Sequence, residues 1–243
     1  MRDYREFLRA LNGQSGRVSL AEPFIPRVIA EQLIWRRGAQ LWDSAEHYVD
    51  TLCELYAYVK SDVVFVDARA YNLRELIKRR ELLPEGMKFV VIIDRTSELD
   101  ALMDDSICAV MTDELDIVER VGTSRERGKS LIFGKPCVYL SRALGDAAKD
   151  DILSASERGF KGVYLPRIDE RLFEFAAEKS VVLLGGVGVD AVNHTQPLDI
   201  YNRVEWLTEH RMRIPLQHQG APAWRRRRVG GAGRISRLHL AAR

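Results

Sequence analysis

The sequence predicts an α/β protein of the (β/α)8 TIM-barrel type, and three observations carry this prediction. Short runs rich in Val, Ile and Leu recur along the chain, and segments with helical spacing lie between them. The runs are continuously apolar, which is typical of parallel strands that are covered on both faces. The chain has neither a GxxxxGK phosphate loop nor a GxGxxG turn after its first run, so we favour a barrel over an open doubly wound sheet.

Seven strands are expected from these runs. They are RVSLAE (17–22), DVVFVDAR (62–69), KFVVIIDR (88–95), ICAVMTD (107–113), KPCVYLSR (135–142), GVYLPR (162–167) and VVLLGG (181–186). A closed barrel needs an eighth strand, for which MRIPLQ (212–217) is a poor candidate. We therefore expect a barrel that is incomplete or poorly closed at its C-terminal strand.

Helices are expected between the strands, because apolar residues recur there at intervals of three and four. The pattern is clearest in AEHYVDTLCELYAYVK (45–60). Three further segments behave in the same way: DDILSASERGF (150–160), DERLFEFAAEK (169–179) and YNRVEWLTEH (201–210).

The last 27 residues differ in composition from the rest. Residues 217–243 hold seven arginines and no acid or lysine, so the +2 net charge of the chain hides a body with 30 Lys and Arg against 35 Asp and Glu. We expect a single barrel domain over residues 1–216 and a disordered Arg/Ala/Gly-rich tail over 217–243.

Two interpretations of this tail stay open. Its basic run Arg225–Arg228 would bind nucleic-acid phosphates weakly and in a salt-dependent way, although we do not expect nucleic acid to be the main partner. The composition break near residue 216, together with the poor eighth strand, also permits the hypothesis that a shifted reading frame encodes the tail. The barrel would then lack its closing strand.

The cysteines indicate a reduced, cytoplasmic protein. Cys53, Cys108 and Cys137 are odd in number, lie far apart and follow no metal-binding spacing. No apolar run approaches the roughly 20 residues of a membrane span, so no membrane partner is expected. The aromatic stretch near Trp35 and Trp42 could serve a homodimer interface as easily as the core.

Charged residues follow almost every predicted strand, at the face where TIM barrels carry their sites. They are Glu22, Asp67, Arg69, Asp94, Arg95, Asp113, Arg142 and Arg167. Four of the seven runs end with an arginine, whose guanidinium group binds carboxylate or phosphate through two parallel hydrogen bonds. The pattern predicts a site for a small anionic substrate, unless these arginines only pair with neighbouring acids.

The glycine-rich turn GGVGVD (185–190) is a second candidate for anion binding. Backbone amides of Gly185 and Gly186 could hold an anion at the start of a helix. A tight turn between strand and helix would need the same glycines. We expect no metal ion, because no two histidines share a metal-ligand spacing.

Parts of the sequence resemble the uroporphyrinogen decarboxylase superfamily. The opening YREFLRALNGQSGRVSL is similar to the family's RExFLxALxGE helix and the DRVPV segment that follows it, and SDVVFVDAR resembles its second strand, DAAIxFSDI. VVLLGGVGVDAVN is similar to the family's late VxLQGNLDP turn. The resemblance covers about a third of the chain and implies a cofactor-independent decarboxylase.

The resemblance also implies roles for single residues, within limits. Asp67 takes the position of the family's aspartate that contacts the pyrrole nitrogens of the substrate. Arg27 could replace one of the two arginines that the family's MRQAGR motif supplies for substrate carboxylates. The family's GFxGxPxTLxxY signature is absent, and so is the HxC pair of the related zinc-dependent methyltransferases.

Three functions remain open at this level. The first is a decarboxylase (lyase) that acts on an anionic polycarboxylate or a tetrapyrrole-like substrate of porphyrin metabolism. The second is an inactive barrel that binds an anion without turnover. The third, which we favour least, is an aldolase-like barrel with an acid pair and a divalent metal.

Overall fold

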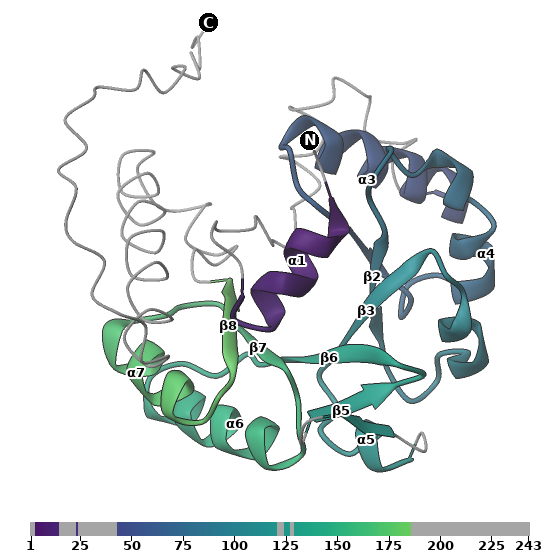
Figure 1. The fold of residues 1–243 in the computed structure, drawn as a ribbon. Helices are drawn as coiled ribbons and strands as arrows, with labels where there is room; N and C mark the ends of the chain where they lie inside the picture. Colours follow the sequence, from purple (N-terminus) through teal and green to yellow (C-terminus); the bar gives the residue numbers. More distant parts are fainter. Residues whose placement is uncertain (1–2, 15–22, 24–42, 121–123, 127–128, 186–243) are drawn as a thin grey trace, which may run out of the picture.

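A curled parallel sheet forms the centre of the computed structural model, which describes residues 3–14, 23, 43–120, 124–126 and 129–185 (Figure 1). Its six parallel strands neighbour one another in the order β1-β2-β3-β6-β7-β8. They are β1 (Val64–Asp67), β2 (Phe89–Ile93), β3 (Ile107–Thr112), β6 (Lys135–Leu140), β7 (Gly162–Leu165) and β8 (Val182–Gly185). We call this curled sheet the half-barrel.

The half-barrel confirms the α/β class and six of the seven predicted strands. Parallel strands that follow each other around the sheet in chain order are typical of barrels, whereas doubly wound sheets reverse direction. The first predicted run (17–22) and the eighth candidate (212–217) lie outside the described residues. Closure into a complete (β/α)8 barrel therefore stays a prediction, as does the division between residues 1–216 and the tail.

Helices cover the outer face of the half-barrel (Figure 1). The main ones are α3 (Ala45–Tyr58), α4 (Leu73–Ile77), α6 (Asp146–Glu157) and α7 (Glu170–Glu178), joined by the shorter η2 (Arg80–Leu82), η3 (Leu99–Met103) and α5 (Ile117–Arg120). Three of the four predicted helices are present, and the fourth (201–210) is outside the described part. None of the described helices is long and apolar enough to cross a bilayer.

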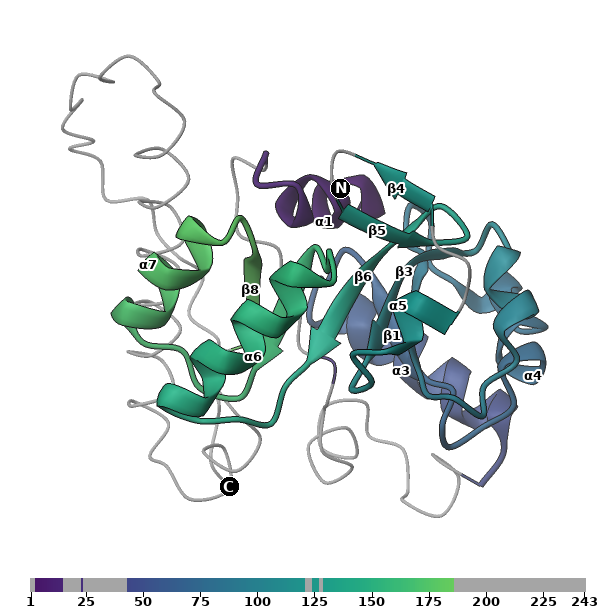
Figure 2. The ribbon, with the colours of Figure 1, turned by 90° about the horizontal axis from the view of Figure 1, so that it is seen from below.

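A β-hairpin that the sequence analysis did not predict precedes β6 (Figure 2). Strands β4 (Ser124–Glu126) and β5 (Lys129–Ile132) pair antiparallel, and β5 also pairs antiparallel with the start of β6. Phe133 and Gly134, which join β5 to β6, have φ angles of 48° and 78°. Two consecutive residues with positive φ are typical of a two-residue type I′ turn, whose twist matches that of the strands it joins.

Helix α1 (Tyr4–Leu11) lies on the concave side of the half-barrel (Figure 1). The Tyr4 amide donates to the Gly86 carbonyl just before β2 (2.9 Å). At the other end of the helix, Lys161 Nζ, just before β7, donates to Asn12 Oδ1 (3.1 Å). Both contacts lie at the amino ends of strands, so α1 closes that end of the half-barrel.

Apolar contacts fix α1 in this position. Phe7 and Leu11, four residues apart on one face of the helix, are both buried. The Phe7 ring packs edge-on against Phe65 of β1, with ring centroids 6.0 Å apart. A Cβ at Gly162, beside Leu11, would lie 2.8 Å from a Leu184 methyl and 3.0 Å from the Val182 carbonyl oxygen, so glycine favours the close packing of β7 on β8 at this end.

We expect that Phe7→Ala lowers the free energy of unfolding by about 3–5 kcal/mol, because it opens a cavity where α1 meets β1. Urea denaturation followed by circular dichroism measures the change. Arg5→Ala is the matched control: it lies on the exposed side of the same helix and should change stability by less than about 0.5 kcal/mol. Equal effects of the two changes would mean that α1 does not cover the sheet in solution.

All three cysteines are free thiols in the core. Burial raises the pKa of Cys53, Cys108 and Cys137 to about 12 in each case. The thiolate is the reactive form, so native thiols should be unreactive at neutral pH. Their placement in the core fits a structural role as apolar packing groups.

A thiol reagent at pH 8 should label the native protein only as fast as the chain opens, because about a thousandfold less thiolate is present than for an ordinary cysteine. In denaturant all three thiols should react at once. Mass spectrometry of the labelled chain distinguishes the two regimes. Rapid labelling of any cysteine under native conditions would contradict the buried positions.

Candidate functional site

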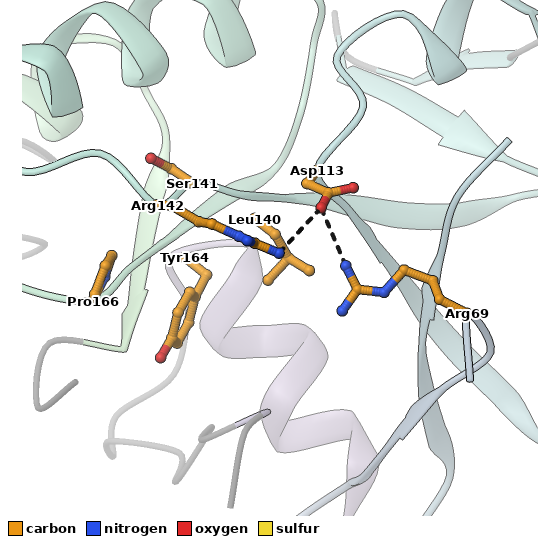
Figure 3. A pocket seen from close by; sticks show the side chains of 7 residues that line it. All are labelled: Arg69, Asp113, Leu140, Ser141, Arg142, Tyr164 and Pro166. Carbon is orange, nitrogen blue, oxygen red and sulfur yellow. Dashed lines mark hydrogen bonds and ion pairs between the residues drawn. The ribbon is translucent and has the colours of Figure 1, made fainter. Parts of the chain in front are cut away.

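A cavity of about 260 Å³ lies at the carboxyl ends of the strands, opposite the end that α1 closes (Figure 3). Strands β1, β3, β6 and β7, or the loops that follow them, supply its walls. The described residues that line it are Arg69, Asp113, Leu140, Ser141, Arg142, Tyr164 and Pro166. Parallel strands place their terminal residues at one edge, and this brings charges from β1, β3 and β6 together.

Arg69 is held by Asp67 at the end of β1. Its Nε and Nη2 donate to the two carboxylate oxygens of Asp67, at 2.9 and 2.8 Å. The Arg69 backbone amide also donates to Asp67 Oδ1 (3.0 Å). These side-chain hydrogen bonds raise the pKa of Arg69 above its ordinary value, so the guanidinium group is always charged. Both side chains are partly buried, which fixes the group at the cavity wall.

Asp113 links Arg69 to Arg142 across the cavity (Figure 3). Arg69 Nη1 donates to Asp113 Oδ2 (3.1 Å), and Arg142 Nη2 lies 3.8 Å from the same oxygen. The Arg142 side chain is 86% exposed. Its contact with Asp113 is therefore a loose surface ion pair that a ligand can replace at little cost.

Tyr48 of α3 fixes the backbone at the end of β1. Amides of alternate residues in a parallel strand point to opposite edges. Val64 and Ala68 donate theirs toward β2, whereas the Asp67 amide points away from β2 and donates to the Tyr48 hydroxyl (2.9 Å). Burial raises the pKa of Tyr48, so it stays a neutral phenol. Its ring stacks on Tyr71, with centroids 4.6 Å apart.

Ser141 anchors the loop that carries Arg142. Its amide donates to the Tyr164 carbonyl (3.0 Å), which extends the pairing of β6 with β7. Its hydroxyl accepts a hydrogen bond from the Ala143 amide (2.9 Å) and donates to Asp151 Oδ2 on α6 (2.5 Å). The backbone beside Arg142 is thus fixed although the Arg142 side chain extends into solvent.

Tyr164 forms one wall of the cavity, and Gly185 allows it to do so. Gly185 ends β8 with φ +87°. A Cβ there would lie 2.5 Å from both the Leu165 carbonyl oxygen and an edge carbon of the Tyr164 ring. Close packing against β7 thus explains one glycine of the predicted anion nest. Gly186 lies outside the described residues, and Gly185 is not among the lining residues.

Four charged residues expected at the mouth do not line the cavity: Asp67, which lies behind Arg69, and Asp94, Arg95 and Arg167. Arg95 instead donates its amide and Nε to Glu114 Oε1 (3.2 and 3.1 Å), with its side chain 64% exposed. Asp94 accepts from Thr96 and Ser97; these hydrogen bonds outweigh its desolvation and lower its pKa. Arg167 is exposed, and no ion pair is found for it within the described part of the chain.

Two further predicted residues, Glu22 and Arg27, lie outside the described residues. Within the described ranges, no group of three His, Cys, Asp or Glu side chains could hold a metal ion. Of the predicted site residues, the structure brings together Arg69, Asp113 and Arg142 at the cavity, with Asp67 behind Arg69.

Four of the lining residues were not predicted as site residues: Leu140, Ser141, Tyr164 and Pro166. All four belong to the predicted runs KPCVYLSR and GVYLPR, close to their carboxyl ends. Charge alone marked candidates at the strand ends, so uncharged residues at equivalent positions were passed over. Leu140, Tyr164 and Pro166 give the cavity a mainly apolar wall beside its charged side chains (Figure 3).

The cavity thus combines two guanidinium groups, one carboxylate and an apolar wall. Arg142 has donors in solvent that can bind a carboxylate in the bidentate geometry. The arginines are not in excess, because Asp67 and Asp113 balance Arg69 and Arg142. Pairing with neighbouring acids is thus observed for both arginines, whereas anion binding by this cluster stays a prediction.

Comparison with known proteins adds no assignment: no family model, no curated protein and no solved structure matches the chain.

We expect that Arg69→Lys lowers the free energy of unfolding by about 1–3 kcal/mol, because one ammonium group cannot serve Asp67 in bidentate fashion and also reach Asp113. Urea denaturation measures the loss. Arg95→Lys is the matched control at the next strand end, where the arginine is exposed, and its unfolding curve should overlay that of the parent. A parent-like Arg69→Lys curve would show that the paired geometry contributes nothing to stability.

Proposed function

We propose that the cavity binds a small carboxylate-bearing molecule through Arg142 and Arg69, and that the chain decarboxylates it in the manner of the uroporphyrinogen decarboxylase superfamily. One observation supports the binding proposal above all others: two arginines from distant strands share Asp113 beside an open cavity. The position of this cavity, at the carboxyl ends of successive parallel strands, is the place where TIM barrels carry their sites. The proposal includes continuation of the half-barrel into a complete barrel.

The chemistry needs an electron acceptor but no cofactor. When a carboxylate on a side chain of a pyrrole-like ring leaves as CO₂, its bonding electron pair passes to the ring, which must first be protonated. A proton is then added to the carbon that lost CO₂, and the ring releases the proton that it first gained, so that one proton is consumed for each CO₂ formed. Retained carboxylates would bind Arg142, and the carboxylates of Asp67 and Asp113 would stabilise the positive ring.

The apolar wall favours this reaction. Leu140, Tyr164 and Pro166 restrict water near a carboxylate that has to lose its charge. Arg69, fixed by Asp67, holds Asp113 in place beside the substrate. In this proposal the apolar residues exclude water, and Arg69 positions Asp113.

A second candidate is an anion-binding barrel without turnover, and one observation favours it. Both oxygens of Asp67, the residue to which the resemblance gives the catalytic contact, already accept hydrogen bonds from Arg69. Asp67 is also not among the described residues that line the cavity. The basic tail that this alternative includes lies outside the described part of the chain.

An assay of CO₂ release distinguishes the two candidates. The parent protein is incubated with uroporphyrinogen and with a panel of small mono- and dicarboxylates labelled at the carboxyl carbon. We expect release that falls at least about a hundredfold in Asp67→Asn, because Arg69 and the developing charge both lose their counter-ion. Asp150→Asn, an exposed carboxylate on α6, should match the parent. No release by the parent from any compound would favour binding without turnover.

A further inference from the structure

The balance of charge in the cavity points to a narrower class of ligand than an anion in general. Two guanidinium groups, Arg69 and Arg142, face two carboxylates, Asp67 and Asp113. Asp94 lies within electrostatic reach of Arg69 and contributes to the raised pKa of Arg69. A ligand with two carboxylates would add negative charge that no described lining residue neutralises.

The carboxylate of Asp113 lines the cavity and is itself a candidate binding group. Its Oδ2 contacts both arginines, and no hydrogen bond or ion pair is found for Oδ1 among the described residues. An ionised carboxylate only accepts hydrogen bonds, so Oδ1 calls for a donor on the ligand. A cationic donor would at the same time restore neutrality when a ligand carboxylate binds Arg142.

The cavity also limits the size of the ligand. A volume of about 260 Å³ lies just below the roughly 300–1,000 Å³ of common ligand pockets. A volume of this size suits a small ligand, or one ring or side chain of a larger ligand that extends out of the open cavity.

We propose that the cavity selects a small zwitterion, with a carboxylate on Arg142 and an amino group on Asp113, over a dicarboxylate of equal length. This inference rests on the proposed function, because it assumes that the cavity binds carboxylates at all. In this mode of binding, the cavity recognises both ends of the ligand and does not rely on the attraction of one negative charge alone. Asp113 then determines specificity, while Arg142 supplies affinity.

Three ligands of about seven to nine non-hydrogen atoms test the proposal by isothermal titration calorimetry. They share a five-carbon chain and a carboxylate, and differ at the other end: 5-aminopentanoate carries an ammonium group, pentanoate a methyl group and glutarate a second carboxylate. We expect 5-aminopentanoate to bind the parent at least about tenfold more tightly than glutarate, with pentanoate in between.

Variants test which residues cause the preference for 5-aminopentanoate over glutarate. Asp113→Asn should reduce the preference for 5-aminopentanoate over glutarate about tenfold, Asp113→Glu should keep its direction, and Asp150→Asn on α6 should change nothing. Arg142→Gln should weaken all three ligands by a similar factor. Thermal unfolding of each variant verifies the fold, and Arg142→Gln with the parent still tests the proposal if Asp113→Asn does not fold.

The outcomes separate the two proposals. If none of the three ligands binds, carboxylate binding at this cavity fails and the inference fails with it. If glutarate binds the parent most tightly, or if Asp113→Asn folds and leaves the preference unchanged, the zwitterion proposal is overturned while carboxylate binding survives. The expected order of affinities, reduced by Asp113→Asn, supports both.

Discussion

A parallel sheet has to be covered on both faces, and the arrangement of the rest of the molecule depends on this constraint. Helices α3, α4, α6 and α7 cover the outside of the half-barrel, and α1 lies within its curve (Figure 1). Because α1 contacts the amino ends of the strands, the carboxyl ends stay accessible to polar groups. The apolar core and the charged mouth therefore occupy opposite ends of the same strands. In β1, Phe65 belongs to the core, and Asp67, two residues later, belongs to the mouth.

Charge at the mouth is organised in pairs. Arg69 is fixed from two sides by carboxylates, whereas Arg142 keeps most of its surface in solvent. A partly buried guanidinium group with two partners is a rigid part of the wall, and an exposed one with a loose partner is free to bind something else. This difference would let the two arginines contribute differently to the proposed binding, Arg69 as a fixed group and Arg142 as an exposed one.

Continuous apolar runs such as KFVVIIDR and ICAVMTD predicted their strands correctly, because burial on both faces leaves no room for polar alternation. The hairpin β4–β5 was missed because its strands are short and hold charged residues. Strand ends predicted that Arg69, Asp113 and Arg142 would meet. The pairing of Arg95 with Glu114 could not be predicted, because it depends on loop conformation. The role of Tyr164 as a cavity wall could not be predicted either, because an aromatic ring near a strand end also suits the core.

The hydroxyl of Tyr48 occupies the outward amide of Asp67, where a carbonyl of an adjacent strand would otherwise accept. Any segment that extends the sheet along this edge of β1 must therefore separate from it before Asp67. The gap between such a segment and β1 would widen toward the carboxyl end of β1, beginning at Asp67, which holds Arg69. The Tyr48 hydroxyl thus limits how far a further strand could pair along β1 beside the residue that holds Arg69.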